Sequence, residues 1–195
     1  MKKIFFTAFI LVLADQVLKF WIKTHMFLGQ EFEIFDWFII HFTENNGMAF
    51  GLEFGGSIGK VLLTLFRIIV VTLGVYYIRS IISVKFRKGA LIASGLILGG
   101  AIGNIIDSTF YGMIFNESYN NVARLFPDSG GYAPFLQGKV VDMFYLPLIN
   151  SHFPNWVPFF GGDHFIFFRP VFNIADAGIS TGIFLILLFY RREFS

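Results

Sequence analysis

The chain alternates between four long apolar runs and segments of mixed polarity. Each run approaches the length of about 20 residues that a helix needs to cross a bilayer. We expect spans at residues 4–22, 58–78, 90–106 and 171–190. The pattern therefore predicts an all-α membrane protein with four transmembrane helices, forming a single domain over residues 1–195.

The first run has some features of a cleavable signal peptide, because it begins after two lysines and its apolar stretch ends at the small residue Ala14. An uncut helix fits the pattern better. Asp15, Gln16 and Lys19 continue one helical face beyond Ala14, and three further spans follow.

Basic residues near the spans predict the orientation. Eight of the 15 cations fall in three short stretches on one side of the membrane, namely Lys2, Lys3, Arg79, Lys85, Arg87, Lys88, Arg191 and Arg192. Short loops rich in Lys and Arg stay in the cytoplasm. Both termini are therefore expected inside, with the outer segments at residues 25–57 and 108–170.

The outer segments carry too many aromatic residues to be disordered linkers. Residues 32–42 alternate partly between apolar and polar positions, which predicts a small extracytoplasmic β-element. Residues 112–138 are richer in Gly, Asn, Ser and Pro and are predicted to form a long outer loop.

Composition narrows the function classes. Hydrophobic residues make up 55% of the chain and charged residues 14%, compared with about 25% charged in ordinary globular proteins. A net charge of +2 gives no argument for a nucleic-acid partner. The absence of Cys excludes disulfides, thiolate metal sites and Cys nucleophiles.

Two Asn-x-x-Asp pairs, Asn104 with Asp107 and Asn173 with Asp176, stand near the predicted outer ends of two spans. Three residues apart places each pair on one helical face. A carboxylate inside the hydrocarbon edge costs several kcal/mol, so such acids indicate function. Asp142 adds a third outer-side carboxylate among apolar neighbours.

Two carboxylates in one site of low dielectric constant cannot both ionise easily, so one pKa rises and a proton is shared. Aspartic peptidases use this arrangement to activate water and to protonate the leaving amine. Spacing alone leaves a second interpretation equally open, in which these acids pair with Arg or cap helix ends.

Five ordered motifs together resemble the lipoprotein signal peptidase family, also called signal peptidase II. They are Asp15-Gln16-x-x-Lys19, Asn45-Asn46-Gly47-Met48-Ala49-Phe50, Gly99-Gly100-Ala101-x-Gly103-Asn104-x-x-Asp107, Val141-Asp142-Met143-Phe144 and Phe172-Asn173-x-Ala175-Asp176. Any one of these motifs is weak evidence, whereas five in order across four spans are highly specific.

The resemblance implies an aspartic endopeptidase of the bacterial cytoplasmic, or inner, membrane with its active site near the outer leaflet. The family removes signal peptides from diacylglyceryl-modified prolipoproteins, cutting immediately before the lipidated Cys, without a metal or other cofactor. The implied partners are lipidated prolipoproteins and membrane lipids, and we expect a monomer. Position by position, the resemblance implies catalytic Asp142 and Asp176, substrate-binding Asn45, Asn104 and Asn173, and supporting Asp15 and Asp107.

The chain departs from the family pattern at Ser108, where an Arg usually follows the aspartate. Arg67, six residues beyond Val61, lies about 9 Å along the second helix at 1.5 Å per residue. Asp176, five residues beyond Val171, lies about 7.5 Å along the fourth. We therefore expect Arg67 to support the site by pairing with Asp107 or a neighbouring carboxylate; the alternative is that it snorkels or bonds backbone carbonyls.

Rival sites have weaker signals. Residues 55–59 fit Gly-x-Ser-x-Gly around Ser57, and His41, His152 or His164 would have to complete a serine protease. The histidines show no paired metal-ligand spacing. A transporter would use Asp107, Asp176 and Arg67 as a proton relay, but a relay needs polar residues through the whole membrane thickness.

Overall fold

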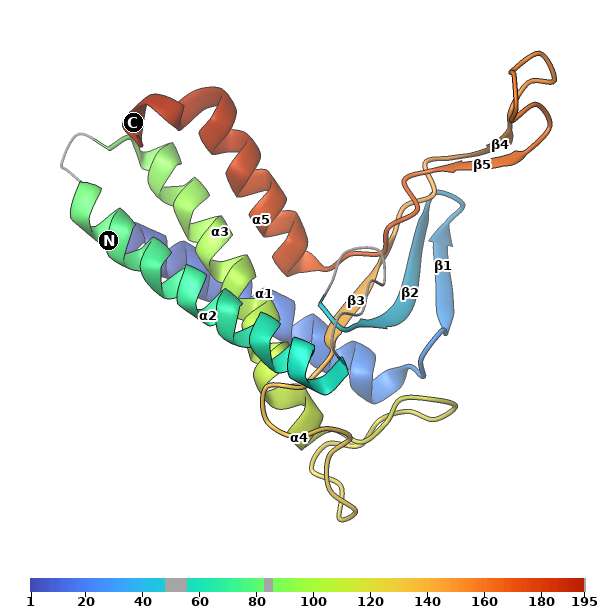
Figure 1. Cartoon of the computed structure of the whole chain (residues 1–195), viewed down its shortest axis with the longest axis horizontal. Helices are drawn as coiled ribbons and strands as arrows, with labels where there is room; N and C mark the ends of the chain where they lie inside the picture. Colours follow the sequence, from blue (N-terminus) through green and yellow to red (C-terminus); the bar gives the residue numbers. More distant parts are fainter. Residues whose placement is uncertain (48–55, 83–85, 195) are drawn as a thin grey trace.

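The computed structural model describes residues 1–47, 56–82 and 86–194. Within these ranges four helices are long and apolar enough to cross a membrane, which confirms the predicted architecture. They comprise α1 (Lys2–His25), α2 (Gly56–Ile81), a third helix that contains α3 (Lys88–Ile106) and continues to Ile114, and a fourth from Ile174 to Glu193 that begins with α5 (Ile174–Leu185). Figure 1 shows both termini at the same end of the helix bundle.

The third helix is longer than predicted. After α3 it continues through a π-helical turn, η2 (Asp107–Tyr111), into the short helix α4 (Gly112–Ile114). Asp107 therefore lies inside a continuous helix and not at its end. π-helical turns within α-helices are frequent at functional sites.

The fourth helix begins later than predicted, at Ile174 instead of residue 171. Asn173 caps it: the Asn173 side chain accepts a hydrogen bond from the Asp176 N–H, and the Asp176 carboxylate accepts one from the Asn173 N–H. Asp176 consequently lies in the first turn, and its expected depth of about 7.5 Å along this helix is wrong. The helix ends in η3 (Ile186–Tyr190) and η4 (Arg191–Glu193).

Glycines let α3 pack closely against both α1 and α5. A Cβ built on Gly99 would lie 2.8 Å from the carbonyl oxygen of Ala8 in α1, and one on Gly100 would lie 2.2 Å from that of Ala175 in α5. Small residues are the usual means by which membrane helices approach each other. This contact brings the polar residues of all three helices within reach of one another.

The β-element predicted at residues 32–42 forms two strands of a three-stranded antiparallel sheet, which lies at the end of the bundle opposite the termini (Figure 1). Its strands are β1 (Glu31–Phe35), β2 (Phe38–Asn45) and β3 (Val140–Tyr145), in that order. Thr43 on β2 pairs with Asp142 on β3, and Asn45 pairs with Val140. Both β2 and β3 thus deliver polar side chains to the same region.

Three strands between residues 108 and 170 were not predicted, namely β3, β4 and β5. The strands β4 (Ile149–His152) and β5 (His164–Phe167) form a separate two-stranded antiparallel sheet. An isolated bridge between Phe144 and Phe172 closes the chain at the base of this hairpin. Residues 115–138 are mainly loop, as expected, with one isolated bridge from Phe115 to Leu125.

Candidate active site

Asp142 and Asp176 come from different elements and share one neighbour, Asn173. The Asn173 amide donates to Asp142 Oδ1 at 2.6 Å, while its Oδ1 accepts the Asp176 N–H at 2.9 Å. Asp142 is 3% exposed, whereas Asp176 is only partly buried. The cap of α5 therefore also joins the two acids.

The other two predicted asparagines contact the same carboxylates. Asn104 Nδ2 donates to Asp176 Oδ1 at 2.8 Å, and Asn45 Nδ2 donates to Asp142 Oδ2 at 3.3 Å. Asn173 also donates to Asn104 Oδ1 at 3.3 Å. Amides orient carboxylates without adding charge, so three asparagines from β2, α3 and the α5 cap fix the pair in place.

The environment of Asp142 favours its protonated form. Burial, and to a smaller extent the charge of Asp176, raises the pKa of Asp142 to about 7, although the amides of Asn45 and Asn173 act in the opposite direction. A carboxyl group that titrates near neutral pH can hold a proton during catalysis and release it.

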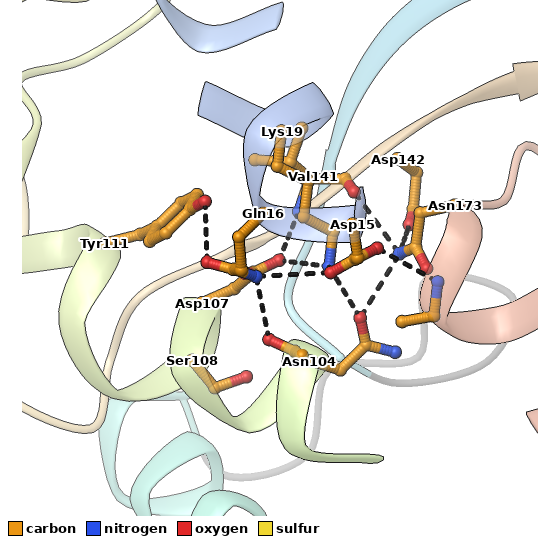
Figure 2. A network of polar contacts seen from close by, with 12 residues as sticks. Asp15, Gln16, Lys19, Asn104, Asp107, Ser108, Tyr111, Val141, Asp142 and Asn173 are labelled. Carbon is orange, nitrogen blue, oxygen red and sulfur yellow. Dashed lines mark hydrogen bonds and ion pairs between the residues drawn. The ribbon is translucent and has the colours of Figure 1, made fainter. Parts of the chain in front are cut away.

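Beside Asp142 lies a buried ion cluster of Lys19, Asp15 and Asp107 (Figure 2). Lys19 Nζ lies 2.8 Å from Asp15 Oδ2 and 2.7 Å from Asp107 Oδ2, and it donates to Asn104 Oδ1 at 2.9 Å. The other oxygen of Asp15 accepts the Ala175 N–H at 2.9 Å. Asp15 thus holds the first turn of α5, and Lys19, which is paired with Asp107, holds the side chain of Asn104.

Gln16 and Tyr111 complete this cluster. Gln16 Nε2 donates to Asp107 Oδ1 at 2.8 Å, and the Tyr111 hydroxyl donates to Gln16 Oε1 at 3.1 Å. Asp107 Oδ2 accepts the Val141 N–H at 3.3 Å. The third membrane helix is therefore hydrogen-bonded to β3 at Val141, one residue before Asp142.

Arg67 is placed differently from the prediction. Its guanidinium donates to Ser108 Oγ at 3.5 Å and to the backbone carbonyl of Gly47. Within the described ranges it forms no ion pair with a carboxylate, so the predicted pairing with Asp107 or a neighbouring carboxylate is wrong, and the bond to the Gly47 carbonyl matches the alternative. The reason is that Lys19 is the cation that pairs with Asp107.

Arg67 reaches the pair indirectly, through a turn. Gly47 has a φ of +90°, and a Cβ there would lie 2.8 Å from Arg67 Nη1. The Gly47 N–H donates to Asn45 Oδ1 at 2.7 Å, and Asn45 contacts Asp142. Met48, Ala49 and Phe50, which complete this motif, lie outside the described residues, as do Gly55 and Lys85.

The rival sites are not assembled in the part of the chain that the structure describes. Ser57 lies exposed in the first turn of α2, His41 pairs with Glu31, and the His152 ring contacts the His164 ring. No group of three or more His, Cys, Asp or Glu residues among the described residues is arranged to hold a metal ion.

A second buried ion cluster attaches the loop at residues 115–138 to β2. Lys23 Nζ lies 2.6 Å from Glu44 Oε1 and donates to Ser118 Oγ at 2.8 Å, and Lys139 Nζ lies 3.2 Å from Glu44 Oε2. Burial alone would raise the pKa of Glu44, but the two lysines outweigh it and lower the pKa. The loop is thereby fixed next to Asn45.

Lys19, Gln16 and Tyr111 are the residues that sequence reasoning did not place in the site. The signal for Lys19 was present, because Asp15, Lys19 and Lys23 recur every four residues in an otherwise apolar span and share one face. Tyr111 carried no such signal, since the third span was expected to end at residue 106.

Comparisons with known proteins cover nearly the whole chain. Residues 7–191 match the sequence model of the family described as "Signal peptidase (SPase) II". A lipoprotein signal peptidase of Porphyromonas gingivalis is 49% identical over 187 residues, covering 95% of this chain and 81% of that protein. One of Amoebophilus asiaticus is 39% identical over 195 residues, covering 98% and 78%.

Solved structures agree with the sequence matches. A bacterial membrane enzyme solved by the in meso method at 2.3 Å resolution superposes with a TM-score of 0.60 at 25% identity, covering 100% of this chain and 91% of that one. A second, at 1.9 Å, gives 0.60 at 26% identity, covering 96% and 92%.

Proposed function

Because the chain belongs to the signal peptidase II family of lipoprotein signal peptidases, we propose that Asp142 and Asp176 are the pair with which this aspartic endopeptidase removes signal peptides from prolipoproteins. One observation carries the assignment of the residues. Asn173 is hydrogen-bonded to both acids, to the Asp142 carboxylate and to the backbone N–H of Asp176.

The two acids have environments suited to different tasks. Asp176 is partly exposed in the first turn of α5, where it can contact the attacking water. Asp142 is the buried, protonated partner near neutral pH. Ionised Asp176 takes a proton from water, whose oxygen adds to the scissile carbonyl carbon while protonated Asp142 donates a hydrogen bond to the carbonyl oxygen. When the C–N bond breaks, Asp176 passes the proton that it took from water to the leaving amine.

Two of the three asparagines keep an amide donor for the substrate, whereas the donors of Asn173 are taken by Asp142, Asn104 and the Val141 carbonyl. Each amide has two N–H donors and an oxygen acceptor. Asn104 uses one donor for Asp176, and Asn45 uses one for Asp142. The remaining donors of these two residues hold the substrate backbone across the pair without adding charge to it.

An apolar groove beside the pair suits an acyl chain. It has a volume of about 280 Å³ and lies between α1, α3, α5 and the bridged residues Phe144 and Phe172. The helices contribute Leu11, Leu96, Ile174, Ala177, Gly178 and Thr181. We assign it to one chain of a diacylglyceryl group on the substrate Cys. Each buried CH₂ contributes about 0.8 kcal/mol before ordering costs.

The arrangement also favours the orientation that the basic residues indicate. Both termini lie at the end of the bundle opposite the three-stranded sheet (Figure 1). With the termini in the cytoplasm, the pair opens at the outer leaflet, where the lipidated Cys of a translocated prolipoprotein lies.

The test is cleavage by the purified chain in detergent of a prolipoprotein with and without the diacylglyceryl group, followed by gel shift and mass analysis. Cleavage immediately before the lipidated Cys, with the unmodified precursor a poor substrate, is expected. Equal rates for the two precursors would contradict the lipid assignment, and no cleavage of either would contradict the proposed function.

A further inference from the structure

The chain between Asp142 and Asp176 carries an arm, formed by β4, β5 and the turn at residues 153–163. Figure 1 shows it extending from the outer end of the bundle, past the three-stranded sheet and across the direction of the helices. The loop around residues 115–135 extends instead beyond the end of the bundle. The arm therefore stays near the level of the outer helix ends.

The two faces of the arm differ in polarity. Ile149 pairs with Phe167 and Ser151 pairs with Phe165. Residues that pair directly across two strands lie on the same face of a sheet, and so does every second residue along a strand. These four residues therefore lie together on one largely apolar face. The paired residues His152 and His164 lie on the other face, together with Ile166. The arm is thus an amphipathic hairpin.

The tip presents aromatic side chains from an ordered turn. Phe153 N–H donates to the Asp163 carbonyl at 2.9 Å, and Gly162 N–H donates to the Phe153 carbonyl at 3.0 Å. On this frame Trp156, Phe159 and Phe160 are 80%, 99% and 56% exposed. Large aromatic groups are therefore held outward by backbone hydrogen bonds.

Water is a poor environment for such an arm. A separate two-stranded hairpin is marginally stable in water, and an exposed apolar hairpin invites aggregation. Residues 146–172 contain one acid, Asp163, and one permanent cation, Arg169. So few charges do not favour a water-facing surface or an ionic partner.

The arm is continuous with the lipid-facing surface of the protein. It leaves the fold at the bridge between Phe144 and Phe172, directly before α5. The fourth helix exposes apolar side chains along its length, among them Ile183, Phe184 and Leu187. Trp is the residue typical of the boundary between the acyl chains and the headgroups, which identifies phospholipid as the occupant of this surface.

We propose that residues 149–167 form an interfacial anchor that lies on the outer leaflet and inserts Trp156, Phe159 and Phe160 among the phospholipid headgroups. Because the arm is rooted between the strand of Asp142 and the helix of Asp176, the anchor sets the height of the pair relative to the leaflet. Pro147 and Pro170 flank the arm and restrict its two connections.

Trp156 is the probe for this interaction. The chain has three Trp residues, and Trp21 and Trp37 are exposed, so both can be replaced by Phe to leave Trp156 alone. The full chain is reconstituted into phosphatidylethanolamine and phosphatidylglycerol vesicles that contain lipids brominated close to the headgroup or close to the chain end. Fluorescence is then titrated with each brominated lipid and with aqueous iodide.

Strong quenching by the headgroup-proximal bromines, several-fold above that by the chain-end bromines, and weak quenching by iodide are expected. The matched control is a chain whose only Trp is at position 119, made by Tyr119→Trp with Phe at the three native Trp positions. This side chain is exposed on the outer loop, and it should respond to iodide but not to brominated lipid.

Two results would overturn the anchor. Trp156 could be quenched by iodide and insensitive to every brominated lipid, or it could become shielded only when a prolipoprotein is added, which would make the occupant a polypeptide. If the reduced-Trp chain does not fold, the difference in lipid quenching between the native chain and its Trp156→Phe variant gives the same answer. These measurements do not depend on peptidase activity, so they are independent of the proposed function.

Discussion

Asn173 donates a hydrogen bond of 2.6 Å to Asp142 from the N-cap of the helix whose first turn carries Asp176. One side chain therefore caps the start of a membrane helix and also binds Asp142. The residue that begins α5 is consequently also a residue of the site.

Replacement of Asn173 by Asp should separate these two tasks. Asp is also a good N-cap, so Asn173→Asp keeps the roughly 1 kcal/mol of capping that Asn173→Ala loses, while both variants lose the amide donors to Asp142 and Asn104. The third carboxylate should slow cleavage by at least about a hundredfold and move the acidic limb of the pH–rate profile to higher pH. Unchanged cleavage by Asn173→Asp would contradict the role of this hydrogen bond.

The pH dependence of cleavage should follow the pKa of Asp142. The mechanism needs Asp142 protonated and Asp176 ionised, so kcat/KM should fall as pH rises through about 7. The measurement is kcat/KM for a lipidated precursor between pH 5 and 9. A rate that is constant from pH 6 to 9 would contradict the assignment of the acid.

Stability should depend on the same ionisation. Burial raises the pKa of Asp142 above its unfolded value, so the folded state binds this proton more tightly. Its contribution to stability is complete below the unfolded pKa and is lost as pH rises toward the folded pKa of about 7. The unfolding temperature of Asp142→Asn minus that of the native chain should therefore increase between pH 4 and pH 8. A constant difference would mean that burial does not penalise the charged form.

The ion cluster of Lys19, Asp15 and Asp107 should be needed for folding. Lys19→Met leaves Asp15 and Asp107 buried without a cation, which should destabilise the chain by about 3–5 kcal/mol. Adding Asp15→Asn and Asp107→Asn should recover most of the loss, since the uncompensated charges are removed. Thermal unfolding in detergent measures both variants, and a Lys19→Met chain as stable as the native one would refute the role of the cluster.

Arg67 should act on cleavage through Gly47 and Asn45. Arg67→Leu removes the donor to the Gly47 carbonyl, so cleavage should fall by about tenfold or more, with a loss of stability as well. Adding Ser108→Arg should recover part of both, because it returns a guanidinium to the same neighbourhood. Arg79→Leu, at the far end of α2, is the matched control. Full activity of Arg67→Leu would remove Arg67 from the site.

Sequence reasoning could predict the four spans because hydrophobic length alone determines them. It misplaced two of their ends for local reasons: the π-helical turn extends the third helix past Asp107, and the Asn173 cap delays the fourth. The pairing of Lys19 with Asp107 depends on how α1 and α3 pack, which helix periodicity does not specify. The arm escaped prediction because each of its strands is only four residues long and Phe165, Ile166 and Phe167 of β5 show no alternation of apolar and polar positions.

Single-turnover cleavage of a diacylglyceryl-modified prolipoprotein by Asp142→Asn and Asp176→Asn tests the central claim most directly. Asp128→Asn, an exposed loop carboxylate, is the matched control, and binding of the lipidated precursor is measured in parallel. The account predicts that both dyad variants lose several orders of magnitude in rate while they still bind the precursor, and that Asp128→Asn cleaves normally. Near-native cleavage by either dyad variant would contradict it.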